Sequence, residues 1–187
     1  MRSRLPIVAE TLDVDERTLR RAAERGAIRC HRPGPRKLEL ADGELDYLLT
    51  HWDLMRALTR ALRTEPNVRL AILYGSMARG DERSGSDVDL LVDLVDESSR
   101  AARGLVRRLE RAVDRDVDLA RSGRALETSP LLVLQVIDEG RVLVDRDRRW
   151  SSLVCQRGRI VGAALRAQET LREQATASFN ELVDLAS

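Results

Sequence analysis

The segment GSMARGDERSGSDVDLLVD, residues 75–93, places a Gly-Ser turn ten residues ahead of an Asp-x-Asp pair. Alternation around the pair predicts a strand, with Asp87 and Asp89 on one face and Val88 and Leu90 on the other. Two carboxylates on one face of a strand can bind the same hard cation, and Mg²⁺ is typically held by one or two carboxylates together with substrate phosphates. Glycine lets a phosphate approach the backbone closely, because it has no side chain. The segment therefore predicts a phosphate-binding turn beside a metal site.

The residues on either side of this segment predict a mixed sheet. The apolar run VRLAILYGS, residues 68–76, is typical of a buried strand that ends at the turn. The later elements follow in the order of an amphipathic helix over 97–113, a strand over 115–122, one buried helix over 127–139 and a strand over 141–147. This order predicts an α+β core, that is, a mixed-sheet α/β domain, over residues 64–147, followed by a helical segment over 148–187.

A metal site of this kind needs a third carboxylate from a neighbouring strand. The stretch RDVDLA supplies two candidates, Asp116 and Asp118, which alternation places on the same face. The spacing alone leaves the choice between them open.

Residues 1–63 differ from the core and predict a separate helical module. Pro6 fits the start of a first helix, Asp15 fits the N-cap of a second helix, and Gly26 fits its end. Two short helices joined by a tight turn form the helix-turn-helix pattern. Residues 30–40 then predict a hairpin or wing, and residues 41–64 predict an amphipathic helix that is broken at Pro66.

Positive charge is concentrated in this module, with eight basic residues and one acidic residue between positions 17 and 37. Such a local excess is the electrostatic footprint expected of a nucleic-acid-binding surface. The candidate DNA contacts are Arg17, Arg20, Arg21 and Arg25.

Composition excludes several other classes of protein. The chain of 187 residues has a net charge of +1, so it is not a general polyanion binder, and its 3% aromatic content disfavours a base-stacking single-strand binder. Cys30 and Cys155 lack the spacing of a zinc site or disulfide framework. No apolar run reaches the roughly 18 residues of a membrane span. We therefore expect a cytoplasmic protein without a membrane partner.

The combined motif resembles the signature of the DNA polymerase beta-like nucleotidyltransferase superfamily, and the flanks ARG and SDVDLLV are similar to its minimal nucleotidyltransferase branch. The resemblance covers roughly residues 66–147. It implies that Gly75 and Ser76 hold the triphosphate, that Asp87 and Asp89 bind two Mg²⁺ ions, and that Asp118 is the third metal ligand.

The resemblance also implies an activity, namely the transfer of NMP, with AMP expected, from ATP or another NTP to a hydroxyl group. The expected acceptor is a protein such as a HEPN-type toxin, which would make the chain an antitoxin. The element ERTLRRAAERGAI resembles winged helix-turn-helix domains, so residues 1–63 could bind DNA. Two alternatives are a DNA-binding transcriptional regulator with a nucleotide-sensing or inactive transferase domain, and a nucleotidyltransferase for small molecules such as aminoglycosides. The sequence leaves open the nucleotide, the acceptor and whether the chain forms a homo-oligomer.

Overall fold

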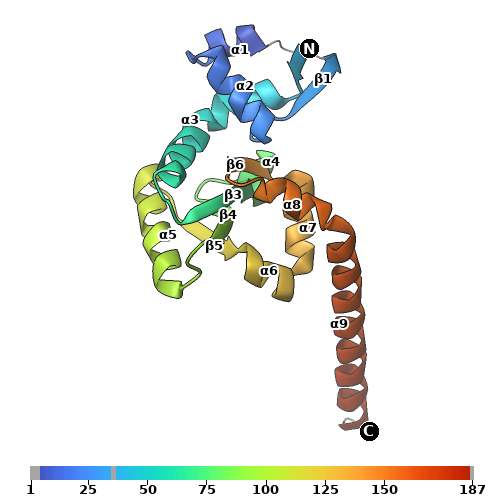
Figure 1. Cartoon of the computed structure of the whole chain (residues 1–187). Helices are drawn as coiled ribbons and strands as arrows, with labels where there is room; N and C mark the ends of the chain where they lie inside the picture. Colours follow the sequence, from blue (N-terminus) through green and yellow to red (C-terminus); the bar gives the residue numbers. More distant parts are fainter. Residues whose placement is uncertain (1–4, 35–36, 186–187) are drawn as a thin grey trace.

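The computed structural model describes residues 5–34 and 37–185, with side chains described up to residue 172. Figure 1 shows a small N-terminal module at the top, a helix-flanked sheet in the middle and a long C-terminal helix that runs away from the sheet. Pro35 and Arg36, in the predicted hairpin turn, lie outside the described residues.

The N-terminal module forms where the capping residues predict it. It consists of two helices and an antiparallel pair of strands: α1 (Leu5–Thr11), α2 (Glu16–Arg25), β1 (Cys30–Gly34) and β2 (Lys37–Leu40). The side chain of Asp15 accepts a hydrogen bond from the backbone N–H of Arg17, and Gly26 ends α2 in the left-handed conformation with φ of 92°.

Helix α3 (Glu44–Arg63) leads from the module to the sheet (Figure 1). Its apolar stripe is buried along its length, and it packs on helix α5 (Ser99–Val113) and strand β6 (Arg141–Asp145). One continuous hydrophobic cluster includes Leu5 in α1, Leu58 in α3 and Val92 in the sheet. The two parts of the chain therefore share α3 and one core, and a domain boundary near residue 64 stays a prediction from sequence.

The central sheet has four strands in the order β5-β4-β3-β6. Strand β3 (Val68–Tyr74) pairs antiparallel with β4 (Val88–Leu94) and with β6, whereas β4 pairs parallel with the edge strand β5 (Val117–Arg121). This mixed sheet with helices on its faces confirms the predicted α+β fold class.

Both faces of the sheet are covered, which explains why the strands are so apolar. Val88, Leu90 and Val92 pack against α3 and α5, while Leu91 lies on the opposite face in a second cluster. The alternation predicted for β4 is therefore confirmed. It leaves Asp89 on the same face as Leu91.

The helices that cover the second face differ from the prediction in one respect. The prediction of a single helix over 127–139 was wrong, because the structure has two helices, α6 (Ser122–Thr128) and α7 (Pro130–Glu139). Pro130 lacks a backbone N–H and fits the first turn of a helix, so it begins a new helix rather than continuing one. The C-terminal segment forms α8 (Arg149–Cys155) and α9 (Arg157–Leu185). Within the described ranges, no helix is long and apolar enough to cross a membrane.

Candidate active site

The Gly-Ser turn lies where β3 passes into the short helix α4 (Gly75–Arg79). Gly75 has a φ of 72°, in the left-handed region that favours glycine. A Cβ atom at this position would lie 2.3 Å from Oδ2 of Asp89 and 3.1 Å from its Cγ. The missing side chain at Gly75 therefore leaves room for the Asp89 carboxylate, in addition to the predicted approach of a phosphate.

Strand register brings the turn and two of the predicted carboxylates together. Asp89 pairs with Tyr74, which directly precedes the turn, on one side and with Asp118 on the other. Asp87 lies in the loop one residue before β4 and is exposed. Asp89 is half-buried and Asp118 is exposed on the edge strand.

The pKa of Asp89 is affected by the two neighbouring carboxylates. Burial raises the pKa of Asp89 above its usual range, and the negative charges of Asp118 and Asp87 raise it further, against an opposing effect of Arg79. Burial and, to a smaller extent, the charges of Asp89 and Asp118 together raise the pKa of Tyr74 to about 12. Three acidic side chains therefore act on one another at the C-terminal end of β3.

Asp116 occupies a different place from Asp118. It precedes β5, and its side chain borders a surface hollow lined also by Arg111, Asp114 and Arg115. The register thus puts Asp118, and not Asp116, beside Asp89.

The donor set suits a divalent cation, since carboxylate oxygens are the ligands that Mg²⁺ prefers and Asp89 lies in the field of two further carboxylates. Among the residues that the structure describes, no three His, Cys, Asp or Glu side chains are gathered closely enough to enclose one ion as they stand. Asp87, Asp89 and Asp118 are the residues that would hold the cation.

The loop between the turn and Asp87 is held by residues that sequence reasoning did not assign to the site. Nε2 of His51, on α3, lies 2.7 Å from Oε1 of Glu82 in this loop. The hydroxyl of Tyr47 donates to the carbonyl of Met77 in α4, and its ring stacks on His51. Helix α3 therefore contacts this segment at two points, directly after the turn and in the middle of the loop that leads to Asp87. No spacing in the sequence links a lone histidine to a glutamate 31 positions away.

The guanidinium of Arg79, in α4 directly after the turn, donates hydrogen bonds to Asp81 and to Glu139 in α7. The four candidate DNA contacts all lie on α2 but differ in exposure and in partners. Arg17 and Arg21 are exposed, Arg20 pairs with Glu16, and Nε of Arg25 donates to the carbonyl of Val142 in β6 at 3.1 Å.

A sequence model of the family described as "Polymerase beta, Nucleotidyltransferase" matches residues 56–149, half of the chain. No curated protein matches the chain significantly.

Solved structures similar to this chain include several toxin-antitoxin complexes. A chain from the crystal structure of a toxin-antitoxin with AMP-PNP has 23% identity and a TM-score of 0.54, covering 65% of this chain and 98% of that one. A chain from the structure of tri-AMPylated Shewanella oneidensis HEPN toxin in complex with MNT antitoxin has 21% identity and a TM-score of 0.51, covering 66% and 96%. A chain from the MntA-HepT toxin-antitoxin structure has 21% identity and a TM-score of 0.50, covering 66% and 97%. At these identities the likeness establishes the fold.

Proposed function

The chain belongs to the polymerase beta nucleotidyltransferase family, and we propose that it transfers NMP, specifically AMP from ATP, to a hydroxyl group of a protein. The observation that carries this proposal is the meeting of Gly75, Asp89 and Asp118 at one end of the sheet. In such a transfer the acceptor oxygen attacks the α-phosphorus, the bond to the bridging oxygen breaks, and pyrophosphate leaves.

Each site residue has a role that its position supports. Gly75 and Ser76 bind the triphosphate at the turn, and Asp87, Asp89 and Asp118 hold the divalent cations, of which the family resemblance implies two Mg²⁺. When bound, these cations neutralise the triphosphate and favour ionisation of the acceptor hydroxyl. Asp118 is exposed on the edge strand β5, where an acceptor can approach, and it is the residue that takes up the proton of the acceptor hydroxyl.

A protein acceptor is supported by the C-terminal helix and by the structural comparisons. Helix α9 extends beyond the body of the molecule (Figure 1), and Leu165 and Leu171 on it are 60% and 62% exposed. Several of the similar structures are toxin-antitoxin complexes, one of which contains an AMPylated HEPN toxin. We infer that the acceptor is a HEPN-type toxin and that this chain is its antitoxin.

The test is incubation of the full chain with α-labelled ATP, Mg²⁺ and a lysate of the organism from which the chain comes. One protein should become labelled, and Asp89→Asn should lower labelling at least about a hundredfold, since loss of a metal ligand removes several kcal/mol of transition-state stabilisation. Asp53→Asn, an exposed carboxylate on α3, is the matched control and should label normally. Unchanged labelling by Asp89→Asn would refute the proposal.

A second function, sequence-specific DNA binding, is favoured by the two helices and the antiparallel hairpin of the N-terminal module. The full chain should bind its own promoter with an affinity that falls steeply as salt rises. Binding should weaken in Arg17→Gln/Arg21→Gln and should persist in Asp87→Asn/Asp89→Asn. Fluorescence anisotropy with labelled duplexes measures both, and equal affinity for a scrambled duplex would refute this function.

A further inference from the structure

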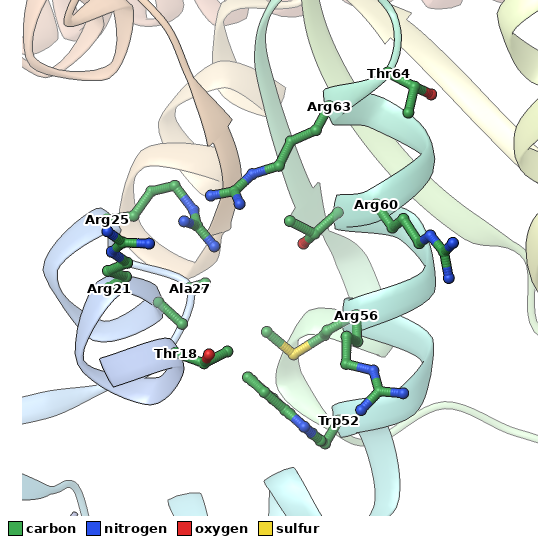
Figure 2. A pocket seen from close by; sticks show the side chains of 12 residues that line it. Thr18, Arg21, Arg25, Ala27, Trp52, Arg56, Arg60, Arg63 and Thr64 are labelled. Carbon is green, nitrogen blue, oxygen red and sulfur yellow. The ribbon is translucent and has the colours of Figure 1, made fainter. Parts of the chain in front are cut away.

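A pocket of about 380 Å³ lies between α2 of the N-terminal module and α3. This volume is within the range of small-molecule sites in proteins. Figure 2 shows the two helices as opposite walls, with side chains from each reaching into the space between them. The pocket shares no lining residue with the candidate active site. Its lining includes Arg21 and Arg25 on α2 and Trp52, Arg56, Arg60 and Arg63 on α3.

The pocket is strongly positive. Five of its lining residues are arginines, and none of its lining residues is acidic. None of these five arginines forms an ion pair within the described part of the chain, although Arg20, Arg79, Arg108 and other arginines of the molecule do. The lack of an internal counter-charge distinguishes this cluster from the paired charges elsewhere on the surface.

Two of the arginines approach each other from opposite walls. In Figure 2 the guanidinium groups of Arg25 on α2 and Arg63 on α3 lie near one another at the same end of the pocket. Burial and, to a smaller extent, the positive charge of Arg63 together lower the pKa of Arg25 to about 10. Neighbouring cations of this kind are stabilised when an anion binds between them, and guanidinium groups bind phosphate oxygens through paired N–H donors.

The floor of the pocket is apolar and contains an unused hydrogen-bond donor. Trp52 is 7% exposed and Met55 is 2% exposed, and Ala22 and Ala27 are buried beside them. The indole of Trp52 extends from α3 towards Thr18 on the opposite wall (Figure 2). Its Nε1 is buried and has no acceptor among the described residues, whereas a buried indole N–H usually has one.

We propose that this pocket binds a small ligand with at least two phosphate groups and a flat ring, of the nucleoside diphosphate or triphosphate class. The arginines bind the phosphates, and the ring lies on the apolar floor beside Trp52. A nucleic acid duplex fits this site less well, because a duplex is read by a helix that projects into its groove, whereas this site is a concave space between two helices.

Such a ligand would act on the module that carries the predicted DNA contacts. Arg25 joins α2 to β6 through the carbonyl of Val142, and Arg63 ends the helix that the two parts of the chain share. A ligand held by both arginines would fix α2 relative to the sheet. The pocket is thus an effector site, separate from the site of nucleotidyl transfer and independent of the function proposed for it.

The chain contains two tryptophans, so Trp150→Phe leaves Trp52 as the only indole fluorophore. The experiment titrates this variant with ADP, ATP and GTP in EDTA, which withholds the cations proposed for the active site. We expect a saturable change in Trp52 emission. Arg21→Gln/Arg63→Gln in the same background should weaken apparent affinity at least tenfold. Arg103→Gln/Arg107→Gln removes the same charge from exposed positions on α5 and should leave the affinity unchanged.

Three results would overturn the proposal. The first is no change in emission at millimolar nucleotide, and the second is equal affinity of the two double-arginine variants. The third is a change in Trp52 emission that duplex DNA produces and nucleotides do not, and that Arg21→Gln/Arg63→Gln removes. This result would assign the pocket to a DNA interface. Circular dichroism of each variant shows whether it is folded.

Discussion

Arg141 and Glu44 form an ion pair in which both side chains are almost completely buried, with exposures of 1% and 3%. Glu44 is the first residue of α3 and Arg141 is the first residue of β6. The guanidinium also donates to the carbonyls of Ala78 in α4 and Ala27 in the N-terminal module, and it lies 3.4 Å above the ring of Tyr47. One buried cation therefore connects the N-terminal module, the shared helix, the turn of the candidate active site and the sheet.

Glu44→Gln should destabilise the protein by about 3 kcal/mol, because removing one partner of a buried pair leaves the other charge uncompensated. Urea unfolding at neutral pH measures the change in free energy of unfolding. Glu16→Gln is the matched control, since the Glu16–Arg20 pair is about 40% exposed on both sides and its loss should cost less than about 1 kcal/mol. Equal effects of the two substitutions would contradict the structural role of Arg141.

Gly75→Ala should abolish nucleotidyl transfer while leaving a folded protein. The new Cβ would meet the Asp89 carboxylate, and the left-handed backbone would add roughly 1–2 kcal/mol of strain. Gly43→Ala separates these effects, because Gly43 has a similar φ of 76° with nothing within 4 Å of the added Cβ. Both variants should lose Tm, Gly75→Ala by at least as much as Gly43→Ala, but only Gly75→Ala should lose transfer of the label. Retained activity in Gly75→Ala would show that Asp89 is not fixed against the turn.

Asp89→Asn should raise the stability of the metal-free protein although it removes activity. Burial and the charges of Asp118 and Asp87 raise the pKa of Asp89, so the folded state disfavours its ionised form. Protonated Asp89 therefore contributes to the free energy of unfolding. This contribution is complete below the pKa of an aspartate in the unfolded chain, about 3.9, and is lost as the pH rises through the raised pKa of the folded protein. The Tm advantage of Asp89→Asn should therefore be present at pH 7 in EDTA and disappear as pH falls through this window.

Thermal scans with and without Mg²⁺ extend this measurement. Mg²⁺ should raise the Tm of the wild-type protein and have little effect on Asp89→Asn, because binding to the folded state stabilises it. An equal Mg²⁺ response of both proteins would argue against a cation at Asp89.

Asp118→Asn and Asp116→Asn provide a paired test of the third carboxylate. Both change one exposed acid on or next to β5, but only Asp118 pairs with Asp89 in the sheet. We expect Asp118→Asn to lower transfer at least about tenfold, since it removes a metal ligand and the proton acceptor, and Asp116→Asn to stay close to wild type. The initial rate of pyrophosphate release measures both, and the reverse order would assign the role to Asp116.

The sequence predicts the fold best where one local pattern determines the structure. Alternation in β4, the cap at Asp15 and the stop at Gly26 each depend on neighbouring residues, and each is found as predicted. The break before Pro130 was missed because the apolar residues after it continue a helical pattern.

The candidate site is only partly predictable from the sequence, because some of its residues are brought together by contacts between distant parts of the chain. Gly75 and Asp89 belong to one short motif, but the position of Asp118 depends on the pairing of β4 with β5, which no local pattern fixes. The pair of Glu44 and Arg141 joins residues 97 positions apart in an arginine-rich chain, where nothing distinguishes a buried arginine from an exposed one. The arginines of the pocket did carry a signal, since Arg56, Arg60 and Arg63 share one face of a helix by their spacing.

Because α3 supplies one wall of the core and also supports the loop before Asp87, residues 1–63 cannot be exchanged as a free-standing cassette. A recombination point at residue 64 would remove Leu48, Leu58 and Leu62 from beneath the sheet and leave Arg141 buried without Glu44. An exchange of the N-terminal elements must therefore leave α3 in place on the sheet.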